Sequence, residues 1–404
     1  MRLLAYCNTK FFGLAADLIN PTIHFHIGYF NKLPLATYGD ELQPRGISDA
    51  CVSASKVDWN TYERSWDFQY SPILTASSES TANLESCYTT WITQNRATIA
   101  EMQRLEEENN RLFIDAYGLA GELTPDVPIE QITLTVNPAY RYGGKMSEAD
   151  LWTRFREDSM RELVSYAIGC MLGRYSLDEP GLIYAHSGNQ GFDPSRYTRF
   201  LADADGILPL TDEEWFAEDA ANRLIEFVSV AWDKTHLEAN LRFLADNLSP
   251  KKTESSRETL RRYLCDNFFK DHLQTYKKRP IYWLFSSGKQ KAFQCLVYLH
   301  RYNEGTLARM RTEYVIPLTA KLNTYAAKLE QDIEASTSTA EKKRLEKELA
   351  ALHNQQAELA TFDEKLRHYA DQRISLDLDD GVKVNYGKFG DLLAEVKAVT
   401  GGKE

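Results

Sequence analysis

Positively charged side chains gather in one part of this chain, between Arg257 and Arg311. The segment holds 12 Lys/Arg and four Asp/Glu, a net charge of 12 − 4 = +8, whereas the whole 404-residue chain carries −11. The rest of the chain must therefore carry −11 − 8 = −19. A basic surface of this kind is what binding along a phosphate backbone requires, because each neutralised phosphate releases counterions.

The densest part of this segment runs from Tyr276 to Lys291 and mixes cations, hydroxyl groups and a glycine. Lysine, arginine and hydroxyl side chains donate to phosphate oxygens, and arginine can also bind base edges. We expect DNA contacts from ten residues: Lys277, Lys278, Arg279, Ser286, Ser287, Lys289, Lys291, Arg301, Arg309 and Arg311.

Other interpretations of the basic segment stay open. It can be an ordinary solvated face, or its cations can pair inside the protein with residues 177–219, which hold ten Asp/Glu. The continuous apolar run Tyr282-Trp283-Leu284-Phe285 favours a buried strand over a base-stacking platform. A basic face open to solvent favours DNA binding, and one buried against 177–219 favours a protein-interaction scaffold.

Asn137-Pro138-Ala139-Tyr140 is similar to the Asn-Pro-Pro-Tyr motif of adenine methyltransferases, whose aromatic ring stacks on a flipped base. The third position here is Ala, and no glycine-rich strand–turn–helix for S-adenosylmethionine precedes the motif. A structural role is therefore favoured, and we identify no catalytic residue.

No metal site is predicted. His24 and His26 would share one face of a strand at 22–28, but no third ligand accompanies them. Asp203-Ala204-Asp205-Gly206 lacks the downstream glutamate of a calcium loop. The six cysteines form no CxxC pair and no zinc-type spacing with histidine.

Length and composition are those of a globular protein with two or three domains, with 43% hydrophobic and 26% charged residues. No window reaches the roughly 18 apolar residues of a membrane span, and the N-terminal apolar run is too short for a signal peptide. Sparse cysteine fits a reducing compartment. We therefore expect a cytoplasmic protein.

Hydrophobic periodicity predicts a helix-rich α+β fold, in which a mixed domain precedes an antiparallel coiled-coil hairpin. The expected hairpin has apolar residues at helical spacing in 318–333 and 345–369, separated by the polar turn 335–339. Residues 376–387 are expected to form a strand and a turn before a short final helix. The other predicted elements are helices at 3–19, 84–117, 148–172, 212–232, 235–247 and 254–270, and short strands at 22–28, 181–185 and 282–285.

Several blocks together resemble a known family, in the same order and over nearly the whole chain. They are similar to the C-terminal half of PglX, the adenine-specific DNA methyltransferase family of BREX phage-defence systems. The blocks are Asn20–Phe25 with Leu33-Pro34, Ser55–Trp59, Ser65–Phe68, Phe113–Leu119, Glu122–Pro125, Tyr166–Ser176, Phe269–Leu273, Tyr276–Lys291 and Ala292–Tyr302.

The resemblance implies a target-recognition role. The family's catalytic unit lies upstream of the represented part, and none of its motifs is matched, so no catalytic residue is carried over. Whether the chain is itself an enzyme stays open, and we expect a C-terminal fragment or the product of a split or truncated gene. S-adenosylmethionine is expected for the full-length family, with no cofactor or metal in this chain. The implied partners are double-stranded DNA, the missing methyltransferase domain and other BREX proteins, with no membrane.

We expect five regions from these observations. They are a junction at 1–48 that follows the missing methyltransferase domain, a helical connector at 49–145, a DNA target-recognition domain at 146–316, the helical hairpin at 317–374 and a C-terminal tail at 375–404.

Overall fold

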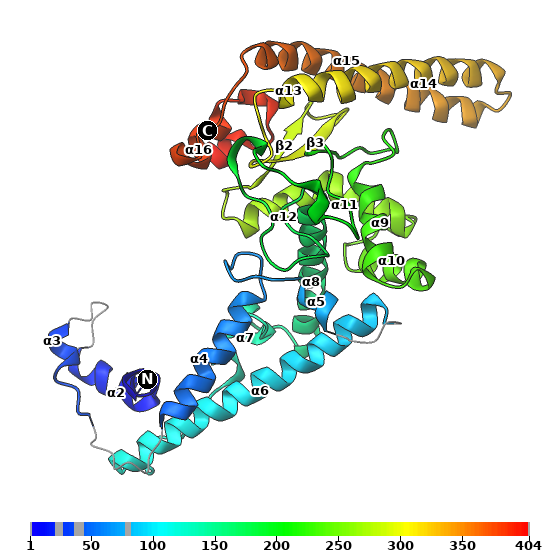
Figure 1. Ribbon diagram of the computed structural model, residues 1–404. Coiled ribbons are helices and arrows are strands. Elements are labelled where there is room, and N and C mark those ends of the chain that lie inside the picture. Colours follow the sequence, from blue (N-terminus) through cyan, green and yellow to red (C-terminus); the bar gives the residue numbers. More distant parts are fainter. Residues whose placement is uncertain (1, 21–26, 36–43, 77–81, 403–404) are drawn as a thin grey trace. The chain divides into compact units, whose positions relative to one another are not determined.

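The computed structural model describes residues 2–20, 27–35, 44–76 and 82–402, which fold into two compact units (Figure 1). Unit 1 comprises residues 1–78 and 86–156, and unit 2 comprises 79–85 and 157–404. Helices predominate, and the strands form one three-stranded antiparallel sheet in unit 2. The predicted α+β, helix-rich class is therefore confirmed. No helix in the described ranges has the length and apolar character needed to cross a membrane.

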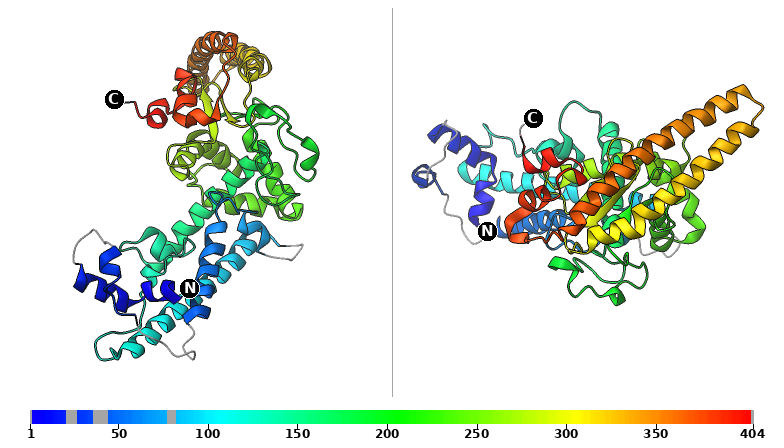
Figure 2. Two further views of the ribbon diagram at one scale, coloured as in Figure 1. Left: turned by 60° about the vertical axis from the view of Figure 1, so that its left-hand side comes forward. Right: turned by 90° about the horizontal axis from the view of Figure 1, so that it is seen from above.

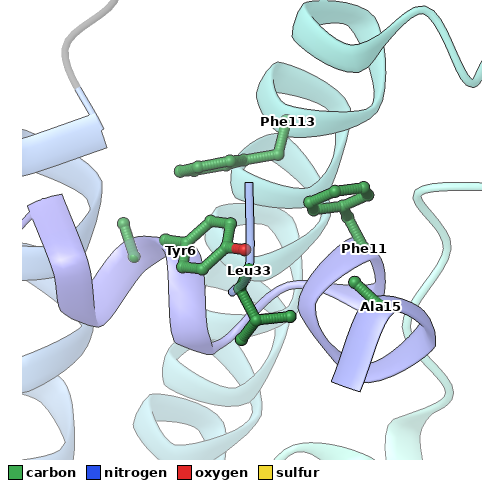
Figure 3. Packing of buried hydrophobic residues seen from close by; sticks show 6 residues of the cluster. Tyr6, Phe11, Ala15, Leu33 and Phe113 are labelled. Atoms are coloured by element: carbon green, nitrogen blue, oxygen red, sulfur yellow. The ribbon is translucent and has the colours of Figure 1, made fainter. Parts of the chain in front are cut away.

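Unit 1 opens with two helices where the sequence predicts one over 3–19. The chain breaks at Asn8-Thr9 because the Thr9 hydroxyl accepts the Phe12 N–H (3.0 Å) and caps a second helix. The first two helices pack on a later long helix through Tyr6, Phe11 and Phe113 (Figure 3). The strand predicted at 22–28, with His24 and His26, lies mostly outside the described residues. The short helices here are α1 (Arg2–Cys7), α2 (Lys10–Ile19) and α3 (Ile27–Phe30).

The helix predicted at 84–117 is confirmed as α6 (Leu84–Tyr117) and ends where Gly118 adopts a positive φ of 66°. Beside it, the buried Asp58 joins two distant parts of unit 1. Its carboxylate accepts the backbone N–H groups of Thr135 (2.7 Å) and Val136 (2.9 Å). The remaining elements of unit 1 are α4 (Pro44–Asn60), α5 (Pro72–Thr75), η1 (Ile129–Gln131) and α7 (Pro138–Tyr142).

The sheet of unit 2 has the strand order β1-β3-β2, with neighbouring strands antiparallel. Its strands are β1 (Ile207–Pro209), β2 (Tyr282–Ser286) and β3 (Gln294–Tyr298). Tyr282 pairs with Tyr298 and Ser286 pairs with Gln294. Nearly every residue of the three strands is buried, which confirms the interpretation of Tyr282–Phe285 as a buried strand.

The strand predicted at 181–185 is wrong. Gly181 turns the chain at a φ of 79°, and Ile183 donates to the Arg174 carbonyl (2.9 Å) across a loop. The short apolar run is therefore part of a turn-rich loop, in which Tyr184 packs its ring against the protein interior.

Local capping shifts or splits the predicted helices of unit 2. The helix predicted at 212–232 begins only after Asp219, whose carboxylate accepts the Asn222 N–H (2.9 Å). The helix predicted at 254–270 is two helices that meet at Asn267, the first starting from a Ser255/Glu258 capping box. The elements are α8 (Glu148–Met171), η2 (Ser187–Asn189), η3 (Pro194–Arg196), α9 (Ala220–Ala231), η4 (Lys234–His236), α10 (Leu237–Asp246), α11 (Ser256–Asp266) and α12 (Phe268–Thr275).

The predicted hairpin is present as two long helices that lie side by side (Figure 2). α14 (Ile316–Ala335) follows α13 (Thr306–Arg309) and the π-helical turn η5 (Met310–Val315), and α15 (Thr339–Asp371) returns after a short turn. Leucines 345, 352, 359 and 366 of α15 recur every seven residues and are buried. Coiled-coil packing between the helices stays a prediction.

The strand predicted at 376–387 is wrong, because this segment is helical. The Asp377 carboxylate accepts the Asp379 N–H (3.0 Å), and the Asn385 amide donates to the Gly381 carbonyl (3.0 Å) within the helical turns. The tail nevertheless reaches the sheet, since Leu393 forms an isolated bridge with Phe285. It contains η6 (Leu378–Asp380), α16 (Gly381–Gly387), η7 (Gly390–Leu392) and α17 (Val396–Thr400).

Asp58→Ala should lower the free energy of unfolding of unit 1 by about 2–3 kcal/mol, because two backbone N–H groups lose a charged acceptor. Urea unfolding measures the loss. Asp126→Ala, which removes an exposed carboxylate from the same unit, should change stability by less than about 0.5 kcal/mol. Equal effects of the two substitutions would show that the Asp58 contacts contribute nothing specific.

Candidate nucleic-acid interface

The cations predicted to bind DNA do not form one continuous surface in the structure. Lys277, Lys278 and Arg279 precede β2, whereas Lys289 and Lys291 lie in the loop after it, at the opposite end of the strand. A five-residue strand separates these two groups by about 13 Å. Further basic residues lie on α11, α12 and the α13–η5 segment.

The first group forms a tight basic loop, residues 277–279, between α12 and β2. Lys277 donates its N–H to the Gln274 carbonyl (3.2 Å), and Lys278 donates to the Leu273 carbonyl (2.7 Å). These are the two hydrogen bonds of a Schellman motif, which closes the C-terminus of α12. Both lysines have positive φ values, 51° and 60°, so the chain turns sharply and exposes three successive cations.

A buried histidine fixes the other side of the basic loop. The His272 Nε2 atom accepts the N–H groups of Ile281 and Tyr282, both at 3.1 Å, where β2 begins. Burial lowers the pKa of His272 to about 3, and the Arg174 charge adds to this effect. The neutral imidazole therefore acts as a permanent acceptor that joins α12 to β2 on either side of the three cations.

The second loop, between β2 and β3, is held by a carboxylate from α15. Glu358 accepts the Ser287 hydroxyl (2.7 Å) and the backbone N–H groups of Gln290 (2.7 Å) and Ala292 (3.3 Å). Gly288 is needed here, because a Cβ atom at this position would lie 2.8 Å from the Glu358 carboxylate and its φ is 140°. This carboxylate occupies the donors that a phosphate would need, and Lys289 is an exposed cation of this loop.

Several predicted contacts have partners within unit 2. Lys291 pairs with Asp266, Arg309 with Glu313 (3.3 Å) and Arg311 with Asp363 (2.8 Å). Ser287 is bound to Glu358. Ser286 accepts the Gln294 amide (3.3 Å).

The prediction for Arg301 is corrected by its position inside the protein. Its side chain is only 1% exposed, and its guanidinium lies 3.7 Å from the centre of the Phe192 ring. It donates to the Asn189 side chain (3.0 Å) and to the carbonyls of Asp203 (2.6 Å) and Ala204 (2.9 Å). Burial lowers the pKa of this guanidinium. Arg301 therefore stabilises the loop before β1 and is unavailable to DNA.

The acidic segment 177–219 neutralises only part of the basic segment. Arg261 pairs with the buried Asp219, and Arg301 binds the carbonyls at 203 and 204. In contrast, five exposed cations form no ion pair with any described residue: Lys270, Lys277, Lys278, Arg279 and Lys289. The geometry therefore leaves three successive exposed cations in the loop 277–279, with Lys270 on α12 and Lys289 at the other end of β2.

A cleft of about 420 Å³ lies between α9, α11 and the β2–β3 loop. Four cations and five carboxylates line it, a net charge of 4 − 5 = −1. Its arginines are already paired, for example Arg257 with Glu238 (2.6 Å) and Arg262 with Glu254 (2.7 Å). Burial and the neighbouring Asp212 raise the pKa of Glu213. This cleft is therefore unsuited to phosphate.

The Asn137–Tyr140 and Asp203–Gly206 motifs form hydrogen bonds within the protein. Asn137 is 1% exposed, caps α7 by accepting the Ala139 N–H (3.2 Å), and donates to the carbonyls of Ile129 and Ile132. The favoured structural interpretation of Asn137–Tyr140 thus agrees with the geometry. Asp203 accepts the N–H groups of Asp205 and Gly206, and no group of three or more metal-ligating side chains occurs in the described ranges.

Two residues that organise this surface, His272 and Glu358, were missed from the sequence. Glu358 lies 68 residues from the Gln290 N–H that it accepts, so no local pattern signals the contact. Lys270, exposed on α12, was also missed, although its place in the basic segment was a usable signal.

Comparison with known proteins finds close similarity in sequence over nearly the whole chain. The chain is 46% identical over 408 residues to the adenine-specific methyltransferase BrxX of Escherichia coli O9:H4 (strain HS). The aligned region covers 99% of this chain and 33% of BrxX. The chain is 37% identical over 390 residues to the adenine-specific methyltransferase PglX of Lacticaseibacillus casei (strain Zhang), covering 95% of this chain and 31% of PglX. The chain is homologous to adenine-specific methyltransferases.

The chain spans about a third of the length of these relatives, so the expected correspondence to a C-terminal half is not confirmed. No family model matches the sequence. The homology supports the predicted relation to PglX, while the contribution of this region to the longer proteins has to be inferred from its own surface.

Acidification should destabilise unit 2 through His272. Its folded pKa of about 3 lies below the ordinary value near 6.5. Protonation therefore favours the unfolded chain as the pH falls below about 6.5, and full stability is present above that pH. The loss is about 1.4 kcal/mol per pH unit. His272→Gln should lose about 2 kcal/mol less than the parent between pH 7 and pH 5, measured by urea unfolding.

His353→Gln is the matched control, because this histidine is exposed on α15. It should leave the pH dependence of the parent unchanged. If His272→Gln and the parent lose equal stability over this pH range, the buried neutral imidazole does not contribute as described.

Glu358→Ala should loosen the β2–β3 loop and lower the free energy of unfolding of unit 2 by about 1.5–3 kcal/mol, because three donors lose a charged acceptor. Hydrogen exchange at the amides of Gln290 and Ala292 should become faster. Glu364→Ala, an exposed carboxylate on the same helix, should leave both amides unchanged. Unaltered exchange in Glu358→Ala would contradict the assigned contacts.

Proposed function

We propose that this chain is the DNA-binding target-recognition portion of a site-specific adenine DNA methyltransferase in a BREX-type phage-defence system. The observation that carries the proposal is the loop 277–279, which exposes three successive cations without an ion pair to any described residue. The attachment of its backbone through His272 supports a binding role, because the loop itself does not have to become ordered when its cations contact phosphate. Homology to BrxX and PglX supplies the reaction class.

In this proposal Lys277, Lys278 and Arg279 contact the phosphates or bases of double-stranded DNA, with Lys270 and Lys289 as additional phosphate contacts. Arg309 and Arg311 contribute only after their carboxylate partners are displaced, and Arg301 contributes to folding alone. Methyl transfer from S-adenosylmethionine belongs to the longer protein, whose methyltransferase domain is the partner of this chain.

We assign one role to each of the five regions expected from the sequence. Residues 146–316 recognise DNA, and the connector at 49–145 and the junction at 1–48 link them to the methyltransferase domain. The hairpin at 317–374 sets spacing or binds that domain, and the tail at 375–404 completes the fold. The charge of the surface supports the first assignment.

A second candidate function is a protein-interaction scaffold that binds other components of the defence system. The pairing of Arg261 with Asp219 favours it, because this contact joins the basic and acidic segments inside unit 2. Only part of the basic segment is neutralised in this way, so DNA binding remains the better supported function.

Binding of labelled duplex DNA over a salt series tests the proposal. Replacing Lys277, Lys278 and Arg279 together with glutamine should weaken duplex binding and reduce the slope of log K against log salt by about three. The matched control changes Lys342, Lys343 and Arg344 to glutamine. These residues have the same types in the same order but lie on α15, so the slope should stay that of the parent.

Two outcomes would contradict the proposal: no binding of duplex DNA by the parent chain, or an equal loss of slope in both triple variants. The second outcome would indicate a diffuse electrostatic attraction rather than a contact at the loop 277–279.

A further inference from the structure

Two tryptophans of unit 1 project into solvent, against the usual tendency of large aromatic side chains to be buried. Trp66 is 95% exposed and Trp59 is 54% exposed. Trp59 lies in the last turn of α4, and Trp66 lies in the loop that follows this helix. The basic surface of unit 2 does not account for either residue.

The backbone that carries these tryptophans is anchored on both sides by buried neighbours. Asp58, next to Trp59, is fixed by its two hydrogen bonds to Thr135 and Val136. Ser65, next to Trp66, binds the Asn60 side chain (2.7 Å) and accepts the Asp67 N–H (3.2 Å) through its hydroxyl.

The buried Phe68 completes this attachment, since its N–H donates to the Ser65 carbonyl (3.4 Å). The loop is therefore held in place, and its exposed indole is presented by an ordered chain. A tryptophan side chain has only two rotatable bonds, so an exposed ring on an ordered backbone loses little entropy when it stacks on a ligand.

The charges of this stretch favour bases over phosphates as the ligand. Lys56 and Arg64 are exposed cations, and the Arg64 guanidinium lies 6.0 Å from the centre of the Trp59 ring. Against them stand Asp58, Glu63 and Asp67, so the stretch 56–67 has a net charge of 2 − 3 = −1 and gives phosphates no net electrostatic attraction. Tryptophan stacks on the π-face of any base, and neighbouring cations assist without setting a sequence preference.

We propose that the exposed rings of Trp59 and Trp66 in unit 1 stack on unpaired bases of DNA. The inference rests on the proposed DNA-binding function and adds a base-stacking site on a different unit from the cationic loop 277–279. Double-stranded DNA keeps its bases stacked inside the helix, so this site should act on a single strand or on a base that has left the duplex.

The test compares a labelled single-stranded oligothymidine with an abasic strand of the same length, which carries equal charge but no bases. The parent chain should bind the oligothymidine more tightly. Replacing Trp59 and Trp66 together with alanine should lower affinity for oligothymidine by about fivefold to a hundredfold and abolish the difference between the strands. The dependence on salt should stay unchanged, because no phosphate contact is removed.

Trp66→Phe is expected to retain most of the preference, since it keeps an aromatic face, and melting curves verify that the variants are folded. Val384→Ala, which trims an exposed apolar side chain of unit 2, should have no effect. The glutamine triple variant at 277–279 should lower the salt slope on both strands but keep the preference for bases.

The inference fails if the double tryptophan variant still prefers oligothymidine to the abasic strand, in which case this surface fits a protein partner better. The proposed function is tested separately, because loss of duplex binding through the loop 277–279 does not depend on the tryptophans. Parent binding to duplex DNA without a preference for bases would therefore overturn only the stacking site.

Discussion

The burial of β2 on both faces is the constraint on which the rest of unit 2 depends. Alternate side chains of a strand point to opposite faces, so both faces need a cover. Trp283 and Phe285 pack against the tail through the Phe389 ring, and Tyr282 stacks on His272 of α12. This edge strand of the sheet therefore holds α12 and the C-terminal tail together although they are more than a hundred residues apart.

The same constraint determines where cations can lie. A strand that is buried on both sides leaves no place for a charge along its length, so the cations next to β2 in the chain lie in the loops at its two ends. At one end, His272 and the Schellman motif expose Lys277 and Lys278. At the other end, the Glu358 carboxylate takes the donors of the loop, so the two ends differ in their capacity to bind phosphate.

Fewer cations are available for binding in the folded protein than a count of charges along the chain suggests. The net charge of +8 in 257–311 treats each cation as available, yet Arg301 is buried and Arg261 is paired with Asp219. An arginine offers five donors and is favoured for buried carbonyl and carboxylate partners, whereas exposed lysines keep their hydration. The surface that remains is therefore rich in lysine and confined to fewer positions than the sequence suggests.

The sequence by itself determined the elements whose signals are local and long. Hydrophobic periodicity located α6, α8 and the helical hairpin, and the continuous apolar run predicted β2. Short segments were less reliable, because a few apolar residues at 181–185 or 376–387 suit a strand only if a neighbouring strand pairs with them. That condition is set by the fold, and neither segment found such a partner.

Only the tertiary structure decided which candidate site residues are available. Lys277 and Arg301 carry the same charge in the sequence. In the structure Lys277 is exposed just after the C-terminus of α12, whereas Arg301 is buried against the Phe192 ring. The contacts of Glu358 join parts of the chain more than sixty residues apart. Such contacts arise from packing between distant segments, so local residue types and spacing carry no signal for them.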